Sequence, residues 1–334
     1  MAGKGEMKTG TYIFISVVMA AVMLLSYGCA ASAGSTQAHR AGPEPTQSTS
    51  HRGIAWPVYN PPPRVDPGED PTEADVVTYS GGKVLDGQTN VYAIFWEDDS
   101  YVRQQPQSQQ ILNEIPNYIR VLTNFFNDFG TSPMYADLLQ YTDSNGHAPI
   151  SARLAATYLD TSRPFPPMMK ADLAMSSQPD LGGFYHQEII NVAKQFGWDY
   201  QNYHNFFFLF PIANNECGAH GFLGDRSGEN IPNGSAVAYG SYPFANGQDQ
   251  CVVSPDSPNG DHIADIATSI AAHELMEAAA DPYINGWGEI ADPCFLPPAT
   301  IDPATGANVK WNGHLYLIQE MWDNYRHGCV LEGP

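Results

Sequence analysis

The sequence predicts an α+β fold in which a twisted, mostly antiparallel β-sheet packs on one central helix. Two apolar runs, residues 90–96 and 205–210, lie between polar or turn-forming residues and are typical of strands. The stretch between Asn259 and Pro282 is rich in Ala, Ile, Leu, Met and Glu, most of which favour a helix. A chain of 334 residues with 43% hydrophobic side chains is long enough to bury a large core around that helix.

Further elements follow from the spacing of apolar residues along residues 74–334, which we expect to form a single globular domain. Residues 111–129 repeat apolar side chains at helical intervals, so that Ile115, Leu122 and Phe125 lie on one face and pack in the core. Other helices are predicted at residues 133–141 and 183–196, and other strands at residues 76–79, 236–242 and 314–322.

The first 33 residues are typical of an export signal. An apolar run of about 14 residues, residues 12–25, follows a basic start and is too short to span a membrane comfortably. Two processing sites stay open. Ala31-Ser32-Ala33 fits a small-x-small cleavage site, whereas residues 25–29 resemble a bacterial lipoprotein box with Cys29 as the lipidated residue. We therefore expect an extracellular or cell-envelope protein that enters the export pathway and is either free or lipid-anchored.

Residues 34–73 are rich in Pro, Ser, Thr and Gln and contain the run Pro61-Pro62-Pro63. A run of three prolines cannot form a helix or a central strand, and so polar a segment cannot bury enough apolar surface to fold. We expect a disordered linker, which would hold the folded domain away from a membrane if Cys29 carries a lipid.

The formal net charge is −21 although only 15% of the residues are charged, because Lys and Arg are scarce. A strongly acidic protein is repelled by phosphate backbones and by anionic lipid surfaces, which argues against nucleic acid and direct membrane binding. Membrane association is expected only through the lipid on Cys29, and the protein is expected to be a monomer.

The central helix carries charged side chains on its apolar face. Asp261 is an N-cap candidate, and Pro282 ends the helix. At about 100° per residue, with Ile270 at zero, His273 falls near 300°, Glu274 near 40° and Glu277 near 340°. These three lie within the same arc of about 120° as the apolar residues, so they point toward the core. Burial of such groups is costly unless they are paired or bind a metal.

The pattern His273-Glu274-x-x-Glu277 therefore predicts a metal site. His273 and Glu277 project from adjacent turns and suit two ligands of one ion, and Glu274 suits a general base that activates water. The zincin motif has a second histidine where this chain has Glu277. Zinc is the expected ion; calcium held by Glu277, Asp281 and neighbouring carboxylates is the other option. The simpler explanation is a buried His–Glu pair that stabilises a core helix.

The third metal ligand is left open by the sequence. Glu289 and Asp292 follow a turn that can fold them back over the helix, and the sequence does not choose between them. Asp281 lies on the same face but at the end of the helix. His220 is a more distant candidate, for which a surface-loop histidine is the simpler explanation.

The cysteines predict disulfide bonds. If Cys29 is lipidated, an even number of cysteines remains in an exported chain, which favours disulfides. We predict pairing in sequence order, Cys217 with Cys251 and Cys294 with Cys329, so that both bonds border the central helix. No Cys-x-x-Cys occurs, which makes a cysteine metal site less favourable.

Several short motifs resemble the phosphate-induced protein 1 (EXORDIUM-like) family. They include Tyr79-Ser-Gly-Gly82, residues 90–96, Cys217-Gly-Ala-His220 and residues 289–294, and they span roughly residues 76–330 in a matching order. The resemblance implies secretion and association with cell walls, without a settled enzymatic activity. This chain departs from many plant members by keeping the His273, Glu274 and Glu277 helix. In this it is similar to the microbial branch, which implies a metallopeptidase-like fold.

These observations lead to two functional hypotheses. The first is a zincin-like, exported zinc peptidase, in which Glu274 activates water and His273, Glu277 and either Glu289 or Asp292 hold the metal; its partner is a peptide. The second is a secreted or wall-associated interaction protein that binds a glycan or another extracellular ligand and keeps a vestigial or structural metal site.

Overall fold

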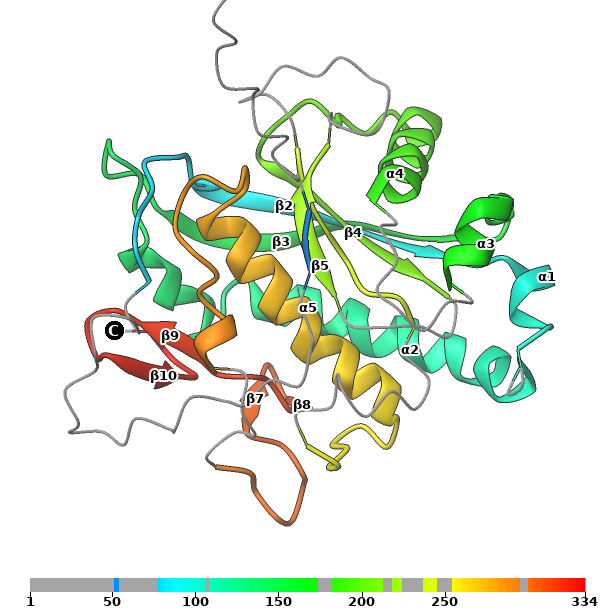
Figure 1. Cartoon of the computed structure of the whole chain (residues 1–334). Coiled ribbons are helices and arrows are strands. Elements are labelled where there is room, and N and C mark those ends of the chain that lie inside the picture. Colours follow the sequence, from blue (N-terminus) through cyan, green and yellow to red (C-terminus); the bar gives the residue numbers. More distant parts are fainter. Residues whose placement is uncertain are drawn as a thin grey trace, which may run out of the picture. The chain divides into compact units, whose positions relative to one another are not determined.

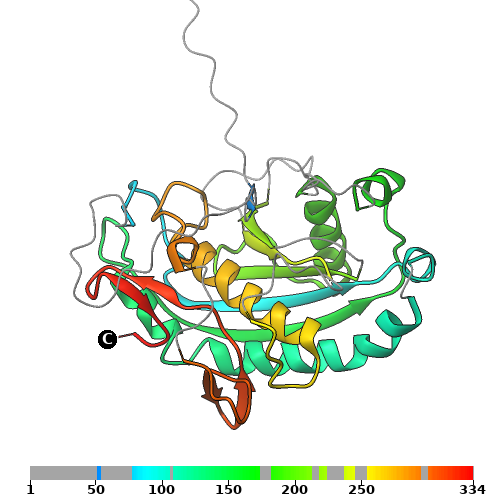
Figure 2. The same cartoon turned by 60° about the horizontal axis from the view of Figure 1, so that its bottom comes forward.

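The computed structural model describes residues 51–53, 77–105, 108–173, 182–212, 218–223, 237–244, 254–294 and 300–333. All of these belong to one unit of the chain, residues 48–334. In this unit a sheet lies between two layers of helices, with α2 and α5 on one side and α4 on the other (Figures 1 and 2). The helices are α1 (Asp99–Val102), α2 (Ser108–Phe129), η2 (Tyr135–Gln140), α3 (Pro167–Leu173), α4 (Gly182–Phe196), α5 (His262–Ala280) and η4 (Asp292–Cys294).

The main sheet has the strand order β1-β5-β6-β4-β2-β3. Its strands are β1 (His51–Gly53), β2 (Gly87–Trp96), β3 (Pro149–Asp160), β4 (Asn205–Pro211), β5 (Ala219–Phe222) and β6 (Ala238–Ser241). The pairs β2–β3, β2–β4 and β4–β6 are parallel, whereas β5 is antiparallel to β6 and β1 is antiparallel to β5. β1 falls within the stretch predicted as a linker.

The prediction of an α+β fold with a mostly antiparallel, zincin-like sheet is wrong. The structure is α/β, and four neighbouring strands of its main sheet run parallel. The order β2, α2, β3, α4, β4 in the chain explains this, because a helix between two strands carries the chain back to start the next strand in the same direction. Of β3 the sequence predicts only a strand end at residues 157–159, and this alternation is therefore not visible in the predicted elements.

Both faces of the central strands are buried, as is usual for parallel sheets. On β2, Val91, Ala93 and Phe95 belong to the core shared with α2 and α5. Ile94 and Trp96 point the other way, into a second core with α4. Helices cover both faces of the two predicted strands, residues 90–96 and 205–210. This explains why these strands are continuous apolar runs.

α5 is the most deeply buried helix of the described part of the chain. The side chain of Asp261 caps its first turn by accepting a hydrogen bond from the amide of Ala264, at 3.1 Å. Every residue from Ile263 to Ala280 is buried. A helix buried on all sides can carry charged groups only if its neighbours supply partners for them, so these groups indicate where the chemistry of the fold lies.

The C-terminal part of the chain adds two small hairpins beside α5. They consist of β7 (Val309–Trp311) with β8 (His314–Tyr316), and of β9 (Met321–Asp323) with β10 (Gly328–Val330). The single strand predicted at residues 314–322 is thus interrupted after Tyr316. A disulfide joins Cys294, at the end of η4, to Cys329 of β10. Cys29, Cys217 and Cys251, and with them the other predicted disulfide and the lipid anchor, lie outside the described residues.

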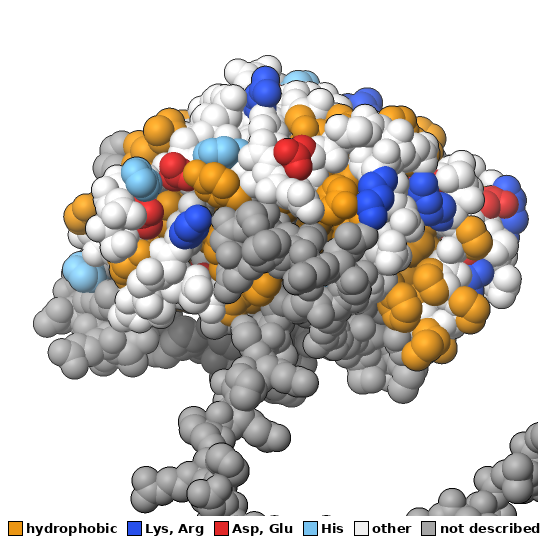
Figure 3. All heavy atoms as spheres, turned by 90° about the horizontal axis from the view of Figure 1, so that it is seen from above, with side chains coloured by type: hydrophobic (Ala, Val, Ile, Leu, Met, Phe, Trp, Pro, Cys, Tyr) orange, Lys and Arg blue, Asp and Glu red, His pale blue; other side chains and the backbone are white. Residues whose placement is uncertain are grey.

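None of the described helices is both long enough and apolar enough to cross a membrane. In the face seen in Figure 3, the Lys and Arg side chains stand apart from one another among polar and hydrophobic areas. That view contains no continuous basic surface among the described residues. The prediction that nucleic acid is not a partner rests on the net charge and stays a prediction.

Candidate metal centre

Four buried ionisable side chains meet between α5 and β5. His273, Glu274 and Glu277 come from the second half of α5, and His220 comes from the middle of β5. The exposed fractions are 1% for both histidines and for Glu274, and 3% for Glu277. The apolar residues of α5 pack on one face of the main sheet, and His220 of β5 reaches Glu274 of the helix.

His273, Glu277 and Asp292 form the first group with metal-ligand spacing. Nε2 of His273 lies 3.1 Å from Oε2 of Glu277 and 3.5 Å from Oδ1 of Asp292. The three ligand atoms all lie within 4.8 Å of one another. Two ligand atoms that bind one ion at about 2.0–2.1 Å with tetrahedral angles are about 3.3 Å apart, so both histidine distances fit a shared ion.

His220, Glu274 and Glu277 form the second group. Nδ1 of His220 lies 3.3 Å from Oε2 of Glu274 and 3.5 Å from Oε2 of Glu277. These ligand atoms also lie within 4.8 Å of one another. On its other side, Nε2 of His220 lies 3.7 Å from Oε2 of Glu289. Oε2 of Glu277 therefore belongs to both groups.

Gln319 orients the imidazole of His273. The side-chain amide nitrogen of Gln319 donates to the carbonyl of Ala291 at 2.6 Å, which identifies its Oε1 as the acceptor facing Nδ1 of His273, at 3.1 Å. Nδ1 of His273 then donates to Gln319, and Nε2 is left to face Glu277 and Asp292. Such a hydrogen bond is the usual device that prepares a histidine to bind a metal.

The backbone orients the carboxylate of Glu277. Its Oε1 accepts hydrogen bonds from the amides of Ala291, at 3.0 Å, and Asp292, at 3.3 Å. The second oxygen, Oε2, is left to face both histidines. The segment that carries Asp292 therefore also holds Glu277 in place, and Gln319 anchors the same segment through Ala291.

The charges of the cluster shift its protonation strongly. Burial lowers the pKa of His273, but the carboxylates, with Glu277 the strongest, outweigh burial and raise it to about 10. Burial likewise opposes protonation of His220, but Glu289 and Glu274 raise its pKa well above the ordinary value. Without another cation, protons on the imidazoles offset the carboxylates. Such an excess of negative charge in a buried site favours the capture of a cation.

Glu274 has a carboxylate oxygen, Oε1, that makes no hydrogen bond within the described residues. Burial raises the pKa of its carboxyl. A Cβ placed on Gly218 would lie only 2.6 Å from Oε1, so the chain passes very close to it at the start of β5. An unpaired, buried carboxylate oxygen is costly, so a cation bound beside Glu274 would offset part of the cost of its burial.

The structure places most of the predicted site residues close together, including both alternatives for the third metal ligand. His273, Glu274 and Glu277 lie in one cluster, as their shared helix face predicts. Glu289 and Asp292 were alternatives for one role, and both approach the cluster, Asp292 beside His273 and Glu289 beside His220.

Asp281 has a structural task instead. Its Oδ1 accepts hydrogen bonds from the amides of Asn285 and Gly286, each at 2.6 Å, and so shapes the turn after α5. His220, which the sequence favours less than the other candidates, lies between Glu274, Glu277 and Glu289. Gln319 was missed, because a single Gln in an alternating segment carries no sequence signal for a hydrogen bond to a residue 46 positions away.

Comparisons with family models, with curated proteins and with solved structures found no match to this chain. The resemblance to the EXORDIUM-like family therefore stays an expectation from short motifs.

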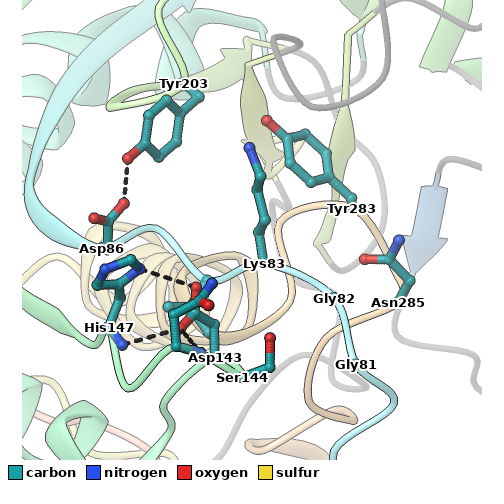
Figure 4. A pocket seen from close by; sticks show the side chains of 12 residues that line it. Gly81, Gly82, Lys83, Asp86, Asp143, Ser144, His147, Tyr203, Tyr283 and Asn285 are labelled. Carbon is teal, nitrogen blue, oxygen red and sulfur yellow. Dashed lines mark hydrogen bonds and ion pairs between the residues drawn. The ribbon is translucent and has the colours of Figure 1, made fainter.

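A polar cleft lies at the end of α5. It has a volume of about 380 Å³, and loops alone line it. Figure 4 shows the amine of Lys83 extending between the rings of Tyr203 and Tyr283. Nζ of Lys83 lies 5.4 Å from the centre of the Tyr203 ring, whose hydroxyl donates to Asp86. Tyr283 belongs to the turn that leads from α5 to Glu289, so the cleft and the cluster share one loop.

Proposed function

We propose that the cluster binds a divalent metal ion, zinc in the first place, and that the protein is an exported metal-dependent hydrolase acting on peptides. The observation that carries this proposal is the preparation of His273. Its Nε2 faces Glu277 and Asp292 at ligand spacing, while Gln319 takes up its other nitrogen. Nitrogen and carboxylate donors in this number match zinc sites that keep a position open for substrate.

In this proposal His273, Glu277 and Asp292 hold the ion, and Glu274 accepts a proton. A divalent ion in such a site polarises a carbonyl group and makes water a better nucleophile. Glu274 is suited to its role because Oε1 of its buried carboxylate has no hydrogen-bond partner within the described residues and can accept a proton. His220, 3.3 Å from Glu274, keeps the accepting carboxylate in position. The resemblance to secreted proteins and the expected export signal support an extracellular or cell-envelope location.

The experiment is a metal analysis of the purified protein by elemental mass spectrometry, together with hydrolysis of a fluorogenic peptide library. We expect bound zinc in the wild type and its loss or strong reduction in His273→Ala. Glu274→Gln should keep the ion held by His273, Glu277 and Asp292. Its rate of peptide hydrolysis should fall at least about 10²-fold, the usual contribution of general base catalysis. Full activity in Glu274→Gln would exclude the catalytic role, and a folded wild type that takes up no supplied metal would exclude the metal site.

The second candidate is binding of an extracellular glycan, and the polar cleft favours it. In the lining of the cleft, the amine of Lys83 is a hydrogen-bond donor, and the carboxylates of Asp86 and Asp143 are acceptors. This combination matches a neutral ligand with many hydroxyl groups, whereas an anion would be repelled by the two carboxylates. The lining residues lie in loops, which disfavours a peptide added as a regular strand. Titration with soluble wall oligosaccharides tests this role. Binding that is lost in Lys83→Met and kept in His273→Ala would support it, and no binding to any wall fraction would count against it.

A further inference from the structure

Two groups of ligand atoms meet at one oxygen of Glu277. Oε2 of Glu277 lies 3.1 Å from Nε2 of His273 and 3.5 Å from Nδ1 of His220. We propose that the centre holds two divalent metal ions bridged by Glu277. His273 and Asp292 complete the first site, and His220 and Glu274 complete the second. The inference rests on the proposed metal binding and adds a second ion to it.

The spacing fits two sites and not one. Each group keeps its own ligand atoms within 4.8 Å of one another, and each histidine lies within 3.1–3.5 Å of two carboxylate oxygens. These are the separations expected around a single ion with bonds of about 2.0–2.1 Å. The imidazoles of His273 and His220 approach Glu277 as members of different ligand groups. A single ion would therefore bind only one of the two imidazoles. A carboxylate between two ions about 3.5–4 Å apart is the usual bridge in two-metal sites.

The charge of the cluster supports a second ion. Four carboxylates surround the two histidines: Glu274, Glu277, Glu289 and Asp292. One divalent ion leaves two negative charges in a site where Glu274 and Glu277 are almost fully buried. Two divalent ions balance all four carboxylates with neutral imidazoles. Uncompensated buried charge is strongly unfavourable, so the second ion has a physical reason to bind.

Glu274 supplies an observation that does not depend on the count of charges. Its carboxyl is 1% exposed, and Oε1 has no hydrogen-bond partner within the described residues. Coordination through Oε2 offsets the cost of burying this group, and Oε1 remains as the proton acceptor. On the far side of His220, Glu289 lies 3.7 Å from Nε2. At this distance Glu289 interacts with the imidazole through charge, and Nδ1 of His220 faces the second site.

The two sites differ in a way that an experiment can use. His273 and Asp292 belong only to the first site, and His220 and Glu274 belong only to the second. Asp292 is half exposed, with 51% of its side chain accessible, whereas His220 is 1% exposed. Removal of His220 is therefore expected to eliminate one ion and leave the other.

The test is the number of metal ions per chain. Metal-stripped full-length protein is saturated with zinc, freed of excess metal and analysed by elemental mass spectrometry, for the wild type, His220→Ala and His273→Ala. His147→Ala, a change at an imidazole that is 57% exposed in a surface loop, is the matched control. We expect two zinc ions in the wild type and in the control, and one each in His220→Ala and His273→Ala.

A second measurement uses only the wild type, in case His220→Ala does not fold. Manganese replaces zinc, and electron paramagnetic resonance is recorded at saturation. Two ions bridged by a carboxylate give an exchange-coupled spectrum, whereas isolated ions do not. One ion per chain with an uncoupled spectrum would overturn the two-ion proposal and leave the metal-dependent hydrolase intact. No ion at all in folded protein would overturn both.

Discussion

Gln319 and His273 are 46 positions apart in the chain, and Oε1 of one lies 3.1 Å from Nδ1 of the other in a fully buried contact. Gln319 also reaches the carbonyl of Ala291, whose own amide holds Glu277. The side chain of Gln319 therefore fixes two things at once: the orientation of the His273 imidazole and the position of the segment that carries Asp292.

Replacement of Gln319 by Met is expected to weaken metal binding about 10- to 100-fold, the usual effect of removing such an outer hydrogen bond. Met has a similar length but cannot accept the proton of His273 Nδ1 or donate to Ala291. Competition with a zinc-binding dye measures the affinity, and circular dichroism shows whether the fold is kept. Gln140→Met, a change at a partly buried glutamine far along the chain from the cluster, is the control. Equal zinc affinity in the wild type and Gln319→Met would contradict the role of Gln319.

Gly218→Ala is expected to destabilise the protein by about 1–3 kcal/mol, because the added methyl group overpacks a closed site. It would meet Oε1 of Glu274 and Cγ2 of Ile270, both at 2.6 Å. The free energy of unfolding from urea titration measures the effect. Gly328→Ala is the control, since a Cβ there meets only a backbone oxygen at 3.9 Å. If both variants unfold at the same urea concentration, the close approach of Gly218 to α5 is not a constraint.

Loss of the disulfide between Cys294 and Cys329 is expected to cost about 2–4 kcal/mol of stability, because the bond closes a loop over a sequence separation of 35. Cys294 ends the short helix η4, which starts at Asp292. The Cys294→Ser/Cys329→Ser double variant should therefore also bind zinc more weakly. Thermal unfolding and zinc competition measure the two effects. A lower melting temperature with unchanged zinc affinity would show that the disulfide supports the fold but not the metal site.

The stability of the protein should fall as pH rises from about 5 to about 9, because of Glu188. Burial and the neighbouring Asp160 raise the pKa of Glu188 from the ordinary 4.5 to about 9. Between these values the folded protein retains a proton that the unfolded chain has released. The free energy of unfolding then decreases by up to about 1.4 kcal/mol per pH unit, and the contribution is fully present only below about pH 4.5.

Glu188→Gln should remove this part of the pH dependence, since the amide does not titrate. Urea unfolding at several pH values compares it with the wild type and with Glu332→Gln, a change at an exposed glutamate. A wild-type profile parallel to that of Glu188→Gln across this range would show that Glu188 is ionised in the folded state.

The sequence by itself determined the helix α5 and the direction of its charged side chains. Asp261 caps the helix, Pro282 follows its end, and the spacing of His273, Glu274 and Glu277 places them on the core face whatever surrounds them. These are local properties, set by backbone geometry within a few residues. The same holds for the apolar runs that became β2 and β4.

Only the tertiary structure decided the rest. The direction of the strands depends on how the chain crosses over between them, and an apolar run has the same composition in a parallel and an antiparallel sheet. Several contacts of the cluster join segments far apart in the chain. They are the contact of His220 with Glu274, the approach of Glu289 and Asp292 to the histidines, and the hydrogen bond from His273 to Gln319. Such contacts are set by the packing of β5 and the C-terminal hairpins against α5, because no local spacing rule connects residues on different elements.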